Sequence, residues 1–164
     1  MTDGRLLAVL IAAAAAADIG AAHAGDACPG VALSGPVKRV YDGDTIEVLG
    51  VPIRLQGIAA PELSEPGGLA IAGAVWDLVA GHTVRCELTG EWSPDGCIGR
   101  CSVGGRADFL ERSVDLAAVL VRDGLARDCP RTSGGRYRDE ERRAVAGGAK
   151  IRRVYPLPDY CRTR

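Results

Sequence analysis

Residues Val40–Glu62 read VYDGDTIEVLGVPIRLQGIAAPE, and the strand pattern of the chain is clearest here. Apolar and polar residues alternate over 45–49 and again over 51–56, on either side of a turn at Gly50. Such alternation is typical of β-strands that bury one face. A third strand is expected over 37–41, before the turn Asp42-Gly43-Asp44. The stretch therefore predicts a three-stranded meander, with Arg54 off its apolar face.

The pattern continues in both directions from this meander. Residues 25–36 are rich in Gly and Pro and are expected to be irregular. Leu69 and Trp76 are expected to lie in the core. Five short strands with a helix after the third predict an α+β fold, a five-stranded OB-fold β-barrel with three helices. Beyond Pro61 the predicted elements are a helix over 69–80, a strand over 83–88, a turn-rich loop, a strand over 98–103, helices over 113–123 and 136–146, and an extended tail over 155–161.

The first 24 residues are typical of a cleaved export signal. Arg5 precedes an apolar run over 6–17, and Ala22-His23-Ala24 matches the small-x-small pattern of a cleavage site. A retained N-terminal anchor is the alternative. We therefore expect a signal peptide over 1–24 and one domain over 25–164, with its core at 37–147 and a tail over 148–164. After cleavage no membrane span would remain, and the protein would be periplasmic or secreted.

All six cysteines follow the proposed cleavage site. An even number of cysteines in a small exported domain is typical of disulfides. A zinc site fits less well, because the sequence has no C-x-x-C and His82 is the one histidine after the cleavage site. We predict one bridge between neighbouring strands, one that fixes the tail, and one between the remaining two cysteines: Cys86–Cys101, Cys129–Cys161 and Cys28–Cys97.

The charges of the two signs nearly balance, with 20 Lys and Arg against 21 Asp and Glu. They are unevenly spread, since eleven Lys and Arg but five Asp and Glu lie from Arg127 onward. A basic end is an electrostatic footprint for polyanions. Biased composition is the alternative explanation, because the chain has 18 arginines, 2 lysines and no asparagine.

Four side chains of the opening stretch have the chemistry of a phosphodiesterase. Asp42, Asp44 and Glu62 supply carboxylates, which are hard ligands that suit Ca²⁺ or Mg²⁺. Arg54 supplies a guanidinium that suits a phosphate. Together they fit metal-assisted cleavage of a phosphodiester bond. The sequence offers no Ser-His-Asp or Cys-His arrangement that would suggest another kind of hydrolase.

Four motifs carry a resemblance to a known family: VYDGDTIEV, IRLQGIAAPE, Gly99-Arg100, and AVLVRDGLAR over 118–127. Over residues 37 to 147 the chain resembles the staphylococcal-nuclease-like (thermonuclease) family. The resemblance implies a Ca²⁺-dependent phosphodiesterase on an OB-fold, with DNA and RNA as substrates. We expect a monomer.

The resemblance also implies a role for each matching residue. Asp44 and the backbone carbonyl of Ala60 would bind Ca²⁺, and Asp42 would set the turn and the field around the ion. Glu62 would orient or deprotonate the attacking water. Two guanidiniums would bind the scissile phosphate and stabilise its transition state, those of Arg54 and Arg100.

The chain departs from the family's pattern at several positions. Ala59 stands where the family has its second metal-binding aspartate, so Ca²⁺ would be held weakly. Ile98 replaces an aromatic residue, and Pro130 and Thr132 replace stacking tyrosines, for which Tyr137 is the candidate substitute. Two functions follow. One is an exported Ca²⁺-assisted nuclease, and the other is a catalytically impaired nucleic-acid-binding or structural module of the cell envelope.

Overall fold

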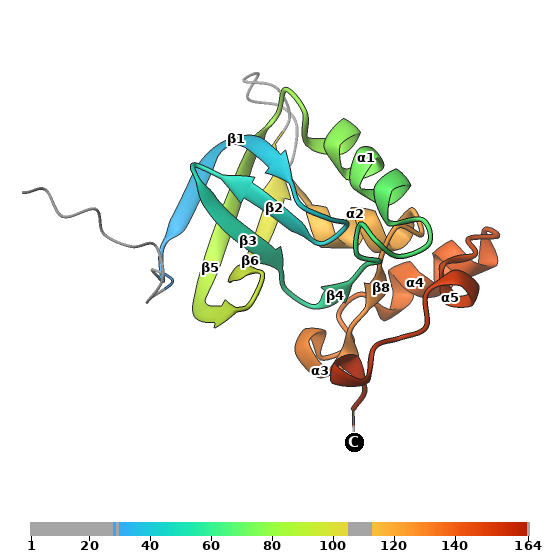
Figure 1. Ribbon diagram of the computed structural model, residues 1–164. Helices are drawn as coiled ribbons and strands as arrows, with labels where there is room; N and C mark the ends of the chain where they lie inside the picture. The colour runs from blue at the N-terminus through green and yellow to red at the C-terminus, as the bar shows by residue number, and fades with distance from the viewer. Residues whose placement is uncertain (1–27, 29, 105–112, 164) are drawn as a thin grey trace, which may run out of the picture.

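The computed structural model describes residues 28, 30–104 and 113–163, so the expected signal peptide lies outside the described residues. Within them, no helix has the length and apolar character needed to cross a membrane. The fold is mixed α+β, with the helices gathered on one side of a sheet (Figure 1). Its elements are β1 (Ala32–Val40), β2 (Thr45–Val48), β3 (Val51–Leu55), β4 (Ile58–Ala59), α1 (Gly68–Val79), β5 (Thr83–Ser93), β6 (Gly96–Val103), β7 (Val114–Asp115), α2 (Leu116–Arg122), β8 (Arg127–Asp128), α3 (Pro130–Ser133), α4 (Arg138–Ala146), α5 (Ile151–Val154) and the 3-10 turn η1 (Asp159–Cys161).

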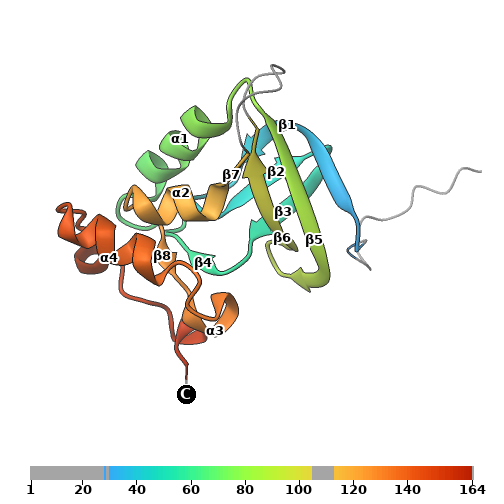
Figure 2. The ribbon, with the colours of Figure 1, turned by 180° about the vertical axis from the view of Figure 1, so that it is seen from behind.

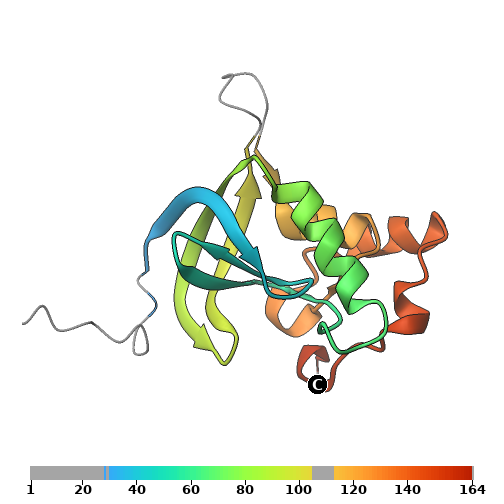
Figure 3. The same ribbon diagram turned by 45° about the horizontal axis from the view of Figure 1, so that its top comes forward.

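Six strands form the main sheet in the order β3-β2-β1-β5-β6-β7, with antiparallel neighbours. β3 also pairs in parallel with β6, where Arg54 lies opposite Ile98. This pairing joins the two ends of the run β3-β2-β1-β5-β6. A second, two-stranded sheet pairs β4 with β8, which brings Ala59 opposite Arg127. Figure 3 shows α1 and the C-terminal helices on the same side of these strands.

Two strands are longer than the sequence predicts. β1 begins at Ala32, inside the segment expected to be irregular, because it pairs with β5 over Ala32–Pro36. β5 continues to Ser93 through the expected loop, and β6 pairs with it as far as Ser93 opposite Gly96. The turn of this hairpin is thereby reduced to Pro94 and Asp95. The hairpin carries Asp95 to the candidate site.

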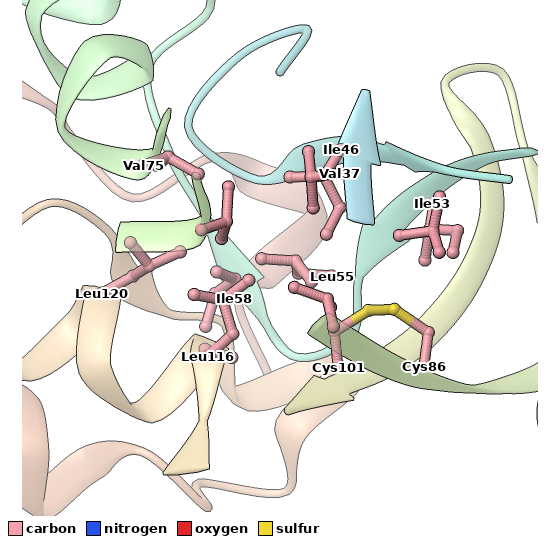
Figure 4. Close-up of a cluster of buried hydrophobic side chains, with 14 of the residues drawn as sticks. Val37, Ile46, Ile53, Leu55, Ile58, Val75, Cys86, Cys101, Leu116 and Leu120 are labelled. Carbon is pink, nitrogen blue, oxygen red and sulfur yellow. A yellow bond between two sulfur atoms is a disulfide. The ribbon is translucent and has the colours of Figure 1, made fainter. Parts of the chain in front are cut away.

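The core lies between the sheet and helices α1 and α2 (Figure 4). Leu69 and Trp76 were expected there, but they are 75% and 43% exposed. The physical reason is the helical period, because α1 buries the stripe Gly68, Ala72, Val75 and Val79. Leu69 and Trp76 lie seven residues apart on another face. The largest fully buried side chains in the figure are Ile46, Ile53, Leu55, Val75, Leu116 and Leu120.

Three disulfides join the pairs of cysteines that the sequence analysis expects. Cys86 and Cys101 face each other across β5 and β6. Cys129, just before α3, is bonded to Cys161 in η1, and both residues are buried. This third bridge holds the C-terminal tail below α3, as Figure 2 shows from behind. Three disulfides are consistent with an exported protein.

Candidate functional site

The turn between β1 and β2 presents two buried aspartates. The Asp44 N–H donates to Asp42 Oδ1 at 2.8 Å, so Asp42 fixes the turn through its own side chain. Gly43 between them has no room for a side chain, since a Cβ there would lie 2.5 Å from the Ala60 Cβ. The segment that carries Ala60 thus packs directly on the turn.

Asp44 is 1% exposed, and both of its carboxylate oxygens are occupied. Arg54 Nη1 lies 2.8 Å from Oδ1, and Arg54 Nη2 donates to Oδ2 at 3.2 Å. The Ala60 N–H donates to Oδ2 at 2.9 Å, and Thr45 Oγ1 donates to Oδ1 at 3.2 Å. Asp44 and Arg54 therefore form a two-point pair inside the protein, which is an ion pair when the Asp44 carboxyl is ionised.

The Arg54 guanidinium is further held by two residues from distant parts of the chain. Nη1 also donates to Asp95 Oδ2 at 2.9 Å, from the β5–β6 turn. Nη2 also donates to the hydroxyl of Tyr160 at 3.0 Å, and Arg54 Cζ lies 5.9 Å from the centroid of that ring. Both terminal nitrogens are thus each engaged with two partners. A phosphate reaching Arg54 would have to displace one of them.

The donors around Asp44 do not fit the calcium ion that the resemblance implies. Ca²⁺ requires six to eight oxygen ligands, whereas Asp44 is surrounded by N–H and O–H donors and by a guanidinium. Ala60, whose carbonyl the resemblance assigns to Ca²⁺, contacts Asp44 through its N–H. Ala59 is fully buried among Ile151, Tyr155 and the Cys129–Cys161 bridge. Among the described residues, no three His, Cys, Asp or Glu side chains are grouped for a metal ion.

Negative charge exceeds positive charge around Arg54. Burial raises the pKa of Asp44 to about 7, Arg54 opposes this rise, and Asp42 adds to it. Partial burial also raises the pKa of Glu62, and the charges of Asp42 and Asp95 raise it further. Four carboxyl groups thus act on one guanidinium. Without an added cation, such a site repels an incoming phosphate.

Wild-type stability is expected to fall as the pH rises from about 4 to about 7. The ordinary pKa of the Asp44 carboxyl is 3.8 and its folded value is about 7, so in this range the folded state holds a proton that the unfolded state has lost. Stability then decreases with rising pH, by about 4 kcal/mol at most. Urea unfolding of wild type and Asp44→Asn across this range measures the effect, and the variant should show a flatter profile.

Asp95→Asn is the matched control, because Asp95 also contacts Arg54 but its side chain is 44% exposed. It should retain the wild-type slope. If the stability of Asp44→Asn falls with pH as steeply as that of wild type, the Asp44 proton does not cause the pH dependence.

Arg100 lies beside this site but is not joined to Arg54. Its Nε donates to Gln56 Oε1 at 2.7 Å, and Gln56 comes directly after the end of β3, two residues beyond Arg54. Arg100 is exposed and lies opposite Glu87 on β5. The two arginines that are expected to bind one phosphate therefore differ in their surroundings. Arg54 is engaged in ion pairs, whereas Arg100 is exposed to solvent.

Tyr137, the expected stacking residue, is a core residue. It is 3% exposed, and its hydroxyl donates to Asp115 Oδ2 at 3.0 Å. Burial raises its pKa to about 12, with the Asp115 charge adding to the effect. The aromatic residue that reaches the site is instead Tyr160. The sequence could have indicated Tyr160 through the next residue, Cys161. The predicted disulfide from Cys161 to Cys129 brings this tail to the segment that follows β8.

No protein-family model matches this chain. The chain is similar to the succinoglycan biosynthesis protein ExoI of Rhizobium meliloti (strain 1021). The two are 32% identical over 128 residues, which cover 71% of this chain and 63% of ExoI. The chain thus spans less than two thirds of the length of ExoI.

Proposed function

We propose that this chain is an exported module with a staphylococcal-nuclease-like OB-fold, which binds a nucleic-acid strand and lacks the family's calcium-dependent cleavage. The order of its sequence motifs supports the resemblance to the staphylococcal-nuclease-like family. Support for the OB-fold comes from the pairing of β3 with β6, which joins the ends of a five-strand run that has α1 inserted after β3. Nuclease and binding module are the two functions that the sequence leaves open.

The observation that favours the binding module is the ion pair between Asp44 and Arg54. Phosphoryl transfer depends on positive charge held ready for the transferring group. Here the guanidinium that should supply this charge is bound by Asp44, Asp95 and the Tyr160 hydroxyl. Ala59 offers no carboxylate, and it is buried in the cluster that contains Ile151, Tyr155 and the Cys129–Cys161 bridge.

The cations that remain available lie on the C-terminal side of the molecule. Over 30–104 the sequence has five Lys and Arg against nine Asp and Glu, whereas over 113–163 it has eleven against seven. Six exposed arginines have no ion pair among the described residues, and two of them are Arg39 and Arg153. The other four are the candidates for a shared surface. They gather on β6, on α3 and at the start of α4: Arg100, Arg131, Arg136 and Arg138. Exposed guanidiniums of this kind bind backbone phosphates.

The second candidate is the Ca²⁺-assisted nuclease, with Arg54, Glu62 and Arg100 as its catalytic residues. One observation favours it, the excess of carboxylates around a single guanidinium. A divalent cation would offset this charge. Because Arg54 would then be released toward the phosphate, the two candidates differ in their response to Ca²⁺.

The relative suggests a competing class of ligand, since ExoI is named for succinoglycan biosynthesis. A polysaccharide would meet the same exposed surface as a nucleic acid. We favour nucleic acid because the motifs resemble those of a nuclease family and because exposed guanidiniums bind phosphates. Polysaccharide binding is therefore a named outcome of the test below.

The test is a pair of assays on the oxidised, exported protein. In a chelator, a fluorescent single-stranded DNA oligonucleotide should bind with an anisotropy change and stay intact on a gel, and Ca²⁺ should not induce cleavage. Cleavage that requires Ca²⁺ and is lost in Arg54→Ala would establish the nuclease instead. Binding of succinoglycan with no binding of the oligonucleotide would overturn the choice of ligand.

A further inference from the structure

A hollow of about 210 Å³ opens beside Arg54, between the paired strands β3 and β6 and the C-terminal tail. Its walls are mainly apolar or uncharged groups, including Ile98, Cys129, Thr132 and Tyr160. Two charged residues, Arg54 and Glu91, also line it. Pockets for drug-sized ligands occupy about 300–1,000 Å³. This hollow therefore has room for one ring system and not for a base pair.

A second, smaller hollow adjoins the first and supplies positive charge. The two share Gln56 and Thr132 in their walls, and the second adds Arg100 and Arg136. Gln56 accepts from Arg100 Nε at 2.7 Å, which orients the guanidinium at this rim. An apolar recess thus lies next to two exposed arginines.

We infer that the two hollows form a subsite for one unpaired nucleotide, with the base against the Tyr160 ring and the phosphate on Arg100 and Arg136. The inference rests on the proposed function and specifies its ligand as single-stranded nucleic acid. An aromatic platform accepts any base, and its partner arginines bind phosphate without reading sequence. Arg54 also lines the first hollow, but its terminal nitrogens are already engaged with Asp44, Asp95 and Tyr160, so the phosphate is assigned to Arg100 and Arg136.

Tyr160 is held in place from two sides. Its hydroxyl is bonded to Arg54 Nη2, and the next residue, Cys161, is bonded to Cys129. The ring is nevertheless 50% exposed, so one part of it contacts the protein and another part faces solvent. Holding an aromatic group in its binding position reduces the entropy lost when a ligand docks. The Arg54 ion-pair network thereby serves as the support for the platform.

The Tyr160→Ala variant tests this subsite. Base stacking on an aromatic side chain contributes about 1–3 kcal/mol per base, so single-stranded affinity should fall about 5- to 150-fold. Tyr160→Phe keeps the ring and should stay within about threefold of wild type. Trp92→Ala is the matched control, because Trp92 is 53% exposed and lines neither hollow. Anisotropy titrations with one oligonucleotide, single-stranded or annealed to its complement, provide the measurement.

The outcomes separate this inference from the proposed function. Wild type should prefer the single strand, and Tyr160→Ala should remove most of that preference while thermal unfolding remains cooperative. If Tyr160→Ala binds as tightly as wild type, the Tyr160 ring does not contact the bound base. If it binds more tightly, the ring blocks the hollow. Either result would overturn the inference. If wild type binds neither form of the oligonucleotide, the proposed function itself fails.

Discussion

Replacing Arg100 and Arg136 together by glutamine is expected to weaken binding of a single-stranded oligonucleotide about 30- to 100-fold at low salt. Each guanidinium would lose a charge-assisted hydrogen bond to phosphate, worth about 1.5–3 kcal/mol before solvent screening. The slope of log K against log salt should also become shallower by about 1.4, since each phosphate contact on a single strand contributes about 0.7. Anisotropy titrations at several salt concentrations measure both quantities.

The matched control is the double variant Arg122→Gln and Arg142→Gln. These exposed arginines lie on α2 and α4, and each forms an ion pair with a neighbouring aspartate. The control removes the same net charge but should lower affinity by less than about threefold, with little change in slope. Equal losses in both double variants would mean that binding depends on overall charge and not on the proposed surface.

Replacing Ala59 by aspartate is expected to destabilise the protein by about 3–5 kcal/mol at neutral pH and not to create a calcium site. Ala59 is fully buried in the cluster that contains Tyr155 and the Cys129–Cys161 bridge. A carboxylate placed there without an assigned partner carries a large desolvation cost. Chemical denaturation with and without Ca²⁺ measures the change in the free energy of unfolding.

Ala59→Val separates the effect of charge from that of volume. It adds methyl groups without a charge and should cost about 1–3 kcal/mol through overpacking. If Ca²⁺ restores Ala59→Asp to wild-type stability, the introduced carboxylate takes part in a calcium site, and the pairing of Arg54 with Asp44 does not prevent Ca²⁺ from binding.

Local patterns predicted much of the fold. The alternation over 45–56 identified β2 and β3, and three helices were expected within a few residues of α1, α2 and α4. The ends of β1 and β5 were missed because they depend on pairing between distant strands, which overrides the glycines and prolines of those segments. The cysteine pairs followed from the expected hairpin and the need to fix the tail.

The candidate site was harder to predict, because its chemistry depends on which partners reach each group. The sequence identified Asp44 and Arg54 as a metal ligand and a phosphate ligand, but not that they bind each other. That outcome requires Asp95 and Tyr160, which lie 41 and 106 residues from Arg54 in the sequence. Tyr137 was the candidate substitute for the stacking tyrosines, but it is buried and its hydroxyl is bonded to Asp115. Contacts over such separations are set by tertiary packing and not by local motifs.

Arg54 is bound to both carboxylate oxygens of Asp44, the residue that the resemblance assigns to Ca²⁺, so we expect no divalent cation to bind there. The most direct test is calorimetric titration of Ca²⁺, to about 10 mM, into the oxidised wild-type protein saturated with single-stranded oligonucleotide. We expect no saturable heat over this range, which covers the weakest calcium modules of extracellular proteins. One saturable site, absent from Asp44→Asn, would contradict the account and establish the chain as a calcium-binding nuclease-type protein.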